Sequence, residues 1–187
     1  MHPILRHSVI FTLILSFIFI SCSSDDPFDI PPPDFSSVPE AYEIENLPTQ
    51  EIEPGVEIIV HEEGLENFEI TARDEVSVFL TQRTEGGEII YSSFANFNEN
   101  PAGLSVRESG TIQNIVDIRQ YSIMIAYSPG LKAGLLGMKE GEQRTIIVSP
   151  EKAYQNAPSG LYISQFRDDT IIYDITVSRI FPNKIRE

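Results

Sequence analysis

Hydrophobic residues near the centre of the chain's second half recur at the spacing of a helix. Leu131, Leu135 and Met138 fall on one face of a helical turn pattern. Ser128 can cap such a helix, and Pro129 suits its first position because the backbone N–H that proline lacks would have no partner there anyway. The pattern predicts a short helix from Pro129 to Met138, weakened by two glycines.

Elsewhere hydrophobic and polar positions alternate, which is the period of a half-buried strand. A glycine-rich turn, Glu85-Gly86-Gly87, separates two of these segments as in a β-hairpin. The segment after the helix ends at Ser149-Pro150, because proline cannot donate to a strand ladder. The predicted strands are residues 56–61, 76–81, 88–91, 144–148 and 170–180.

The N-terminal residues have the pattern of a sorting signal. Arg6 precedes an apolar run, Val9 to Ile20, which is too short for a comfortable transmembrane helix and suits a signal-peptide core. Phe19-Ile20-Ser21-Cys22 resembles a bacterial lipobox, in which the cysteine is lipidated and becomes the mature N-terminus. We therefore expect a lipoprotein signal peptide over residues 1–21 and lipidation at Cys22; the alternative is a plain secretory signal.

Residues 22–54 are rich in proline and acidic residues and contain no lysine or arginine. Such a segment cannot bury enough apolar surface to offset its ordering entropy, so we expect a disordered tether. Ser23-Ser24-Asp25-Asp26 resembles the export tag of Bacteroidetes surface lipoproteins. We expect a protein that is lipid-anchored in the bacterial envelope, at the outer membrane, with the periplasmic or surface face left open.

Composition narrows the possible chemistry. Twenty-eight acidic residues against 13 Lys plus Arg argue against nucleic-acid binding. A single cysteine excludes an internal disulfide, and His61 is the only histidine outside the signal. The mature chain therefore lacks the residues for a Cys–His pair, a Ser–His triad or a His-rich metal site, and we expect neither metal nor cofactor. We expect His61 to be a surface residue.

The stretch from Pro129 to Tyr154 resembles the central motif of the FKBP-type peptidyl-prolyl cis-trans isomerases. Glycines, prolines and an aromatic stand at the family's offsets: Pro129, Gly130, Gly134, Leu135, Met138, Gly141, Pro150, Ala153 and Tyr154. The strands and hairpin around it also follow the family's order. The resemblance implies an α+β fold, a twisted antiparallel sheet curled around one short helix, over residues 55–182, with a tail at 183–187. It also implies an insertion at about 94–127, which we interpret as a flap.

The resemblance further implies a peptide-binding cleft between the strands and the helix. Its catalytic positions correspond to Tyr154, which would bind the substrate carbonyl at the rim of the cleft, and to Ser128 and Tyr127. Its pocket positions correspond to Leu80, Ile90, Tyr91, Leu131 and Tyr173, several of which replace family aromatics. Leu80 stands for the tyrosine of the family's V-x-Y-T-G motif and is followed by Thr81-Gln82. Phe94 and Phe97 are candidates for a further aromatic wall.

Three functions remain open from the sequence. The first is an isomerase that acts on proline-containing polypeptides and assists folding of secreted or envelope proteins. The second is a catalytically weakened FKBP-like binding or chaperone module, which the replaced pocket aromatics favour. The third is an accessory lipoprotein of gliding motility, which no residue of the sequence tests. We expect a monomer attached to the membrane through its N-terminal lipid.

Overall fold

The computed structural model describes residues 32–66, 68–106, 112–114, 128–160 and 162–183. The chain divides into two compact units, residues 1–32 and 33–187, and everything below concerns the second. The predicted signal peptide, Cys22, the acidic export tag and Tyr127 lie outside the described residues. Within the described ranges, no helix has the length and apolar character needed to cross a membrane.

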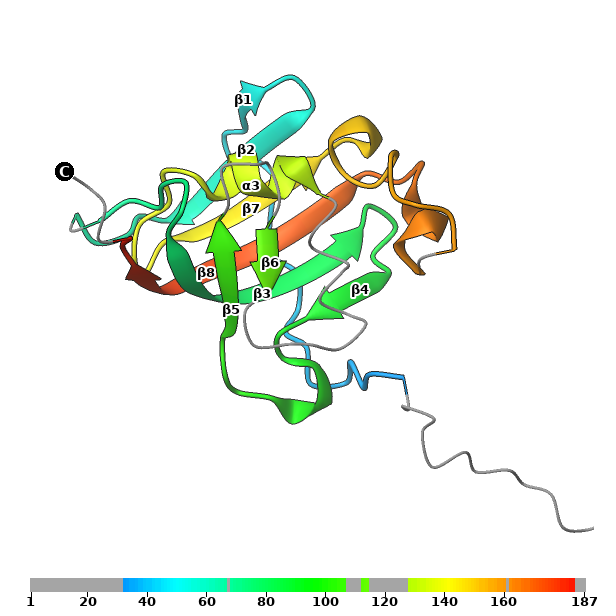
Figure 1. Cartoon of the computed structure of the whole chain (residues 1–187), viewed down its shortest axis with the longest axis horizontal. Helices are drawn as coiled ribbons and strands as arrows, with labels where there is room; N and C mark the ends of the chain where they lie inside the picture. Colours follow the sequence, from blue (N-terminus) through cyan, green and yellow to red (C-terminus); the bar gives the residue numbers. More distant parts are fainter. Residues whose placement is uncertain (1–31, 67, 107–111, 115–127, 161, 184–187) are drawn as a thin grey trace, which may run out of the picture. The chain divides into compact units, whose positions relative to one another are not determined.

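The described residues form an eight-stranded antiparallel sheet with one short α-helix, α3, Pro129–Leu135, lying against it (Figure 1). The strand order is β1-β2-β7-β8-β3-β5-β6, and β4 pairs with the remaining part of β3. The predicted α+β class is therefore confirmed. The strands are β1 (Gln50–Glu53), β2 (Val56–Glu62), β3 (Glu75–Thr84), β4 (Ile89–Ser92), β5 (Ala102–Val106), β6 (Ile112–Asn114), β7 (Gln143–Val148) and β8 (Ile171–Phe181).

The central strand β3 carries two different faces. Val76, Val78 and Leu80 are fully buried in the hydrophobic core on one side, together with residues of α3, β7 and β8. Phe79 and Arg83 point to the opposite side, since successive side chains of a strand alternate. The core side holds the candidate site, and the other side holds a polar network.

Helix α3 begins as the sequence predicts and ends earlier. The hydroxyl oxygen of Ser128 accepts a hydrogen bond from the backbone N–H of Leu131 at 3.4 Å, and Pro129 occupies the first turn. The helix ends at Leu135 rather than at Met138, because Leu136 is extended and Gly137 has a φ of +80°. Glycine adopts that left-handed conformation without the steric cost of a side chain.

The prediction of a disordered tether over residues 22–54 is wrong for its second half. Strand β1 begins at Gln50 and pairs with β2, and residues 33 onward belong to the compact unit. Arg83 donates a hydrogen bond to the Pro39 carbonyl at 2.7 Å, and the Tyr42 hydroxyl lies 2.7 Å from Thr176 Oγ1. The expectation of disorder was based on the composition of the segment alone, but this segment packs against side chains of the sheet.

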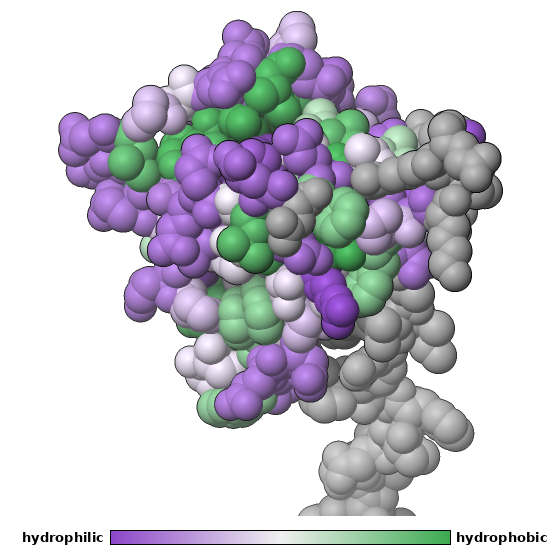
Figure 2. Space-filling view, turned by 90° about the vertical axis from the view of Figure 1, so that its left-hand side faces the viewer, coloured by the Kyte–Doolittle hydropathy of each residue, from purple (hydrophilic) through white to green (hydrophobic). Residues whose placement is uncertain are grey.

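The predicted insertion contributes edge strands to the sheet. Strand β5 pairs with the first half of β3, and β6 pairs with β5, so at least this part of residues 94–127 is not a flap. Phe94 stacks on Phe79 at 5.2 Å between ring centroids, on the side of β3 away from Leu80. Phe97 is 71% exposed and is one of the large hydrophobic side chains that remain at the surface, where hydrophobic areas lie between polar ones (Figure 2). Neither phenylalanine forms the predicted aromatic wall.

Candidate functional site

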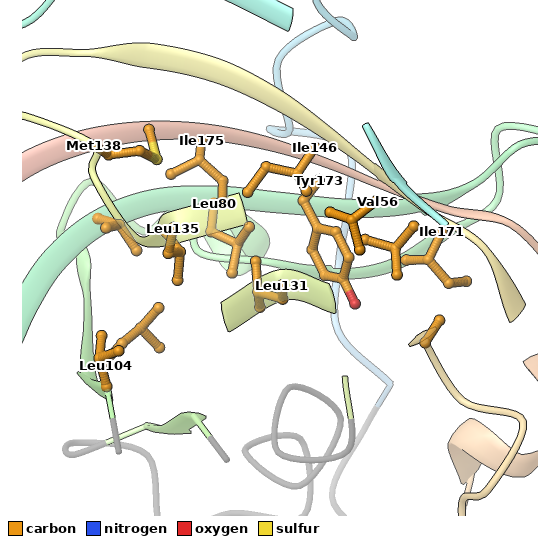
Figure 3. Packing of buried hydrophobic residues seen from close by; sticks show 14 of the residues in the cluster. Val56, Leu80, Leu104, Leu131, Leu135, Met138, Ile146, Ile171, Tyr173 and Ile175 are labelled. Atoms are coloured by element: carbon orange, nitrogen blue, oxygen red, sulfur yellow. The ribbon is translucent and has the colours of Figure 1, made fainter. Parts of the chain in front are cut away.

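Four parts of the fold bring the predicted pocket residues together. Leu80 comes from β3, Leu131 from α3, Tyr173 from β8, and Tyr154 from the turn that follows β7. All four side chains have 0% exposure and belong to one hydrophobic cluster. Figure 3 shows Leu131 of α3 packed beside the ring of Tyr173. These four residues, which come from distant parts of the sequence, thus lie in the same hydrophobic core.

Tyr154 is not at a rim, as the sequence led us to expect. Pro150 ends β7 and starts a short 3-10 helix, Pro150–Lys152, which turns the chain so that Tyr154 enters the core. Its hydroxyl accepts a hydrogen bond from Gln82 Nε2 at 2.5 Å and lies 3.5 Å from the Tyr173 hydroxyl. A buried tyrosine hydroxyl needs such partners, and here the protein itself provides them. The protein's own side chains therefore enclose the Tyr154 hydroxyl.

Burial raises the pKa of both tyrosines. Loss of hydration raises the pKa of Tyr154 well above 10, with a smaller contribution from the neighbouring Tyr173, while the Gln82 hydrogen bond acts in the opposite direction. Loss of hydration also raises the pKa of Tyr173 to about 12, against the lowering effect of hydrogen bonds with Ser128 and Tyr154. Both groups are therefore neutral hydroxyls at physiological pH.

Ser128 has two roles at this site. It caps α3, which fixes the position of Leu131, and its side chain also hydrogen-bonds with Tyr173. With 1% of its surface exposed, it lies inside the cluster rather than on the surface. Tyr127, predicted as its neighbour in the site, lies outside the described residues.

Strand β4 supplies the two remaining pocket positions. Ile90 is 2% exposed and lies in the core cluster. Tyr91 is half-buried, packs against that cluster and pairs with Gln82 across β3 and β4. Both predicted residues therefore border the site, with the aliphatic one deeper than the aromatic one.

Gln82 is the site residue that sequence reasoning missed. Its side chain has 0% exposure, and its Nε2 donates to Tyr154. Its Oε1 has no hydrogen-bond partner; among the described side chains, only Arg167 Nε shares that condition. The sequence does carry a signal for this residue: the family's V-x-Y-T-G motif has glycine after the threonine, and this chain has the polar residue Gln82 there.

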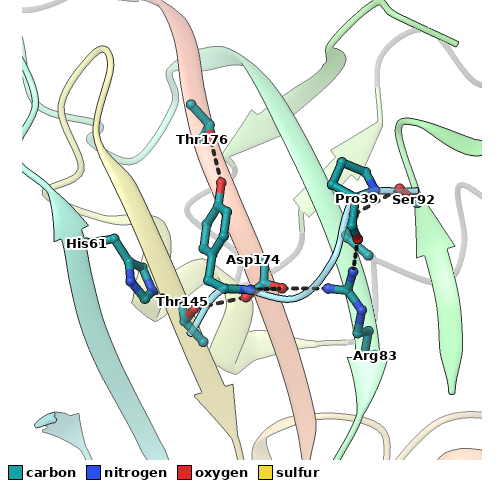
Figure 4. A network of polar contacts seen from close by, with 9 residues as sticks. Pro39, His61, Arg83, Ser92, Thr145, Asp174 and Thr176 are labelled. Carbon is teal, nitrogen blue, oxygen red and sulfur yellow. Dashed lines mark hydrogen bonds and ion pairs between the residues drawn. The ribbon is translucent and has the colours of Figure 1, made fainter. Parts of the chain in front are cut away.

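A polar network occupies the other side of the sheet, away from the tyrosine cluster (Figure 4). Arg83 and Asp174 form a buried ion pair at 2.5 Å, and Asp174 also accepts a hydrogen bond from Thr145 at 2.9 Å. His61 Nε2 lies 2.9 Å from the same threonine hydroxyl, and its ring makes an edge contact with Tyr42. His61 is thus partly buried in a network, and the loss of hydration lowers its pKa.

Other surface features lie outside the tyrosine site. A pocket of about 350 Å³ is lined by Glu66, Phe68, Glu69 and Lys139, none of which is a predicted site residue. Within the described ranges, no group of three or more His, Cys, Asp or Glu side chains is arranged to hold a metal ion.

The described residues thus form an antiparallel sheet with one capped helix and a core in which two tyrosine hydroxyls lie among apolar side chains. The sequence profile of the FKBP-type peptidyl-prolyl cis-trans isomerases matches residues 67–178, which is more than half of the chain. The chain belongs to this family. The family predicted from the sequence is therefore confirmed.

Solved structures show the same fold at low sequence identity. The N-terminal domain of FKBP42 from Arabidopsis thaliana is 14% identical with a TM-score of 0.54, and the match covers 78% of this chain and 99% of that one. A multi-domain immunophilin from the same plant is 15% identical with a TM-score of 0.57 over 79% of this chain and 51% of that one. The three FKBP domains of wheat FKBP73 give 18% identity and a TM-score of 0.51 over 73% of this chain and 50% of theirs.

The chain therefore spans about half the length of the two multi-domain structures and nearly all of the single FKBP42 domain. A search of curated proteins gave no match.

Proposed function

We propose that this protein is a lipid-anchored peptidyl-prolyl isomerase that assists the folding of secreted or envelope proteins. The observation that supports the proposal best is the convergence of Ser128, Leu131, Tyr154 and Tyr173 in one apolar cluster with neutral hydroxyls. Leu131 and Tyr154 belong to the stretch from Pro129 to Tyr154 that resembles the family motif, Ser128 directly precedes it, and Tyr173 comes from β8.

Rotation about a peptide bond to proline breaks no covalent bond and needs no proton transfer. The barrier is about 18–20 kcal/mol because resonance gives the C–N bond partial double-bond character. An apolar wall removes water from the amide, which weakens that resonance, and a fixed donor holds a flanking carbonyl. In this chain Leu80, Ile90 and Leu131 supply the apolar wall, and Tyr154 supplies the hydroxyl.

Peptide entry requires a rearrangement, since the side chains of the site are buried. When a peptide carbonyl approaches Tyr154, it meets a hydroxyl already held by Gln82 and Tyr173. Holding the phenol in place reduces the entropy lost when the substrate binds, which is the general advantage of a preorganised site.

The test is the refolding of a protein whose slow phase is limited by proline isomerisation, with the full-length chain added in detergent. We expect acceleration by the wild type, and Tyr154→Phe should lower kcat/KM about tenfold, the value of roughly one hydrogen bond. Tyr42→Phe is a matched control, because it removes a partly buried hydroxyl that contacts Thr176 on the side of the sheet away from Tyr154. Equal activity of the three proteins would refute the role of Tyr154, and no acceleration by the wild type would refute the isomerase proposal.

Anchoring is tested separately through Cys22. In a bacterial host with a lipoprotein pathway, the wild type should incorporate radiolabelled palmitate and sediment with membranes. Cys22→Ala should lose the label and appear in the periplasmic fraction, because one acyl chain contributes about 0.8 kcal/mol per buried methylene and none would remain. Labelling that persists without Cys22 would contradict lipidation at this residue.

A second candidate is a binding module with weak catalysis. The replacement of family aromatics by Leu80 and Ile90 favours it, because fewer aromatic side chains then wall the site than the family resemblance implies. This candidate predicts that the wild type suppresses aggregation of an unfolded client at stoichiometric concentration, while the proline-limited refolding rate does not change. Acceleration at a tenth of the client concentration would favour the enzyme instead.

A further inference from the structure

Gln82 lies at the centre of the candidate site because of the sheet register. It pairs with Tyr173 on β8 and with Tyr91 on β4, so both neighbouring strands place an aromatic side chain next to it. Paired residues of antiparallel strands point to the same face, which here is the core face. The side-chain amide of Gln82 is thus surrounded by the residues assigned to the peptide pocket.

The nitrogen and the oxygen of that amide differ in their hydrogen bonding. Nε2 donates to the Tyr154 hydroxyl at 2.5 Å, whereas Oε1 is buried and has no partner. A buried acceptor without a donor costs about 1–3 kcal/mol, so it favours any state in which a donor arrives. Such atoms are rare in folded proteins, and each calls for a physical reason.

A peptide substrate can supply the missing donor. Proline has no backbone N–H, so the nearest donors are the N–H groups of the residues before and after it. Tyr154 offers a hydroxyl to a peptide carbonyl, and Gln82 Oε1 offers an acceptor to a peptide N–H. Together the two side chains provide the complementary pair that an extended backbone requires.

Building on the proposed function, we propose that Gln82 is a specificity-determining residue that accepts a backbone N–H flanking the substrate proline, while its Nε2 positions the Tyr154 hydroxyl. Gln82 thus recognises the peptide backbone rather than a side chain. The expected preference is for peptides with an ordinary amide at that flanking position, whatever the side chain there.

The test uses a leucine–proline–phenylalanine peptide and two ester analogues, each lacking one flanking N–H. With the full-length wild type, one ester should bind about tenfold more weakly than the amide peptide, with the loss in KM rather than in kcat, because one hydrogen bond is removed. In Gln82→Met, which keeps the side-chain length without the amide, amide and ester should bind within about twofold of each other.

A merely structural role for Gln82 predicts the same ester effect in the wild type and in the variant, and that result would overturn the inference. Equal affinity of all three peptides for the wild type would do so as well. Should Gln82→Met fold poorly, Gln82→Gly, the residue of the family motif, provides the same comparison. If the wild type binds peptides without isomerising them, calorimetry gives the ester comparison directly, so failure of the enzyme proposal is distinguishable from failure of this one.

Discussion

Replacing Asp174 by alanine should strongly destabilise the fold. The carboxylate lies on β8 and is 7% exposed. One oxygen accepts from Arg83 at 2.5 Å, and the other accepts from Thr145 at 2.9 Å. Without Asp174, the Arg83 guanidinium keeps the Pro39 carbonyl as a neutral partner, and its charge stays buried without an opposite charge.

The magnitude follows from the burial of both partners. Breaking a buried ion pair by removing one member costs about 3–5 kcal/mol, because the remaining charge is uncompensated. A domain of this size has about 5–15 kcal/mol of stability in total, so a large share would be lost. Replacing both members by apolar residues, as in Arg83→Met with Asp174→Val, should recover most of the loss since no charge is then left buried.

The measurement is urea unfolding followed by far-UV circular dichroism, because the chain has no tryptophan to serve as a fluorescence probe. Glu53→Ala is the matched control: its carboxylate pairs with Lys152 at 3.1 Å, but both side chains are 37% exposed. An exposed pair contributes about 0–1 kcal/mol. If Asp174→Ala loses no more stability than Glu53→Ala, the argument from burial fails.

Three further predictions concern stability. Gly134→Ala should cost about 1–2 kcal/mol by urea unfolding, because a Cβ there would lie 2.4 Å from Ile146 Cγ2, and this clash outweighs the roughly 1 kcal/mol that alanine gains in a helix. Measured in an Ile146→Ala background, the same substitution should cost less, because the clashing side chain is gone. Burial lowers the pKa of His61, so the unfolded chain binds more protons than the folded chain below about pH 6.5. The urea midpoint should therefore decrease as the pH is lowered through that window, and His61→Gln should not show this decrease. The pKa of Tyr173 is about 12 in the folded chain, so above pH 10 this tyrosine ionises more readily in the unfolded chain. Stability should therefore fall as the pH rises from 10 to 12, and the fall should be less steep in Tyr173→Phe.

The N-terminal boundary shows what local composition misses. Prolines and acids make residues 33–54 unable to fold alone, yet Pro39 and Tyr42 find partners on β3 and β8. Those partners come from strands that are distant in the sequence, so no window around Pro39 contains them. A chain that begins at residue 55 would lack β1 and both contacts.

The elements of the fold, by contrast, follow from the order of residues. Strand and helix periods depend on side-chain direction along a few residues, and the caps and glycines of residues 128–141 depend on local backbone geometry. Residue order therefore predicted five of the eight strands, the start of α3 and the family, whereas β1, β5 and β6 lie in segments that it assigned to a tether and an insertion. The burial of Tyr154 and its hydrogen bond with Gln82 depend on tertiary contacts, because the turn after β7 places Tyr154 in the core next to a residue of the distant strand β3.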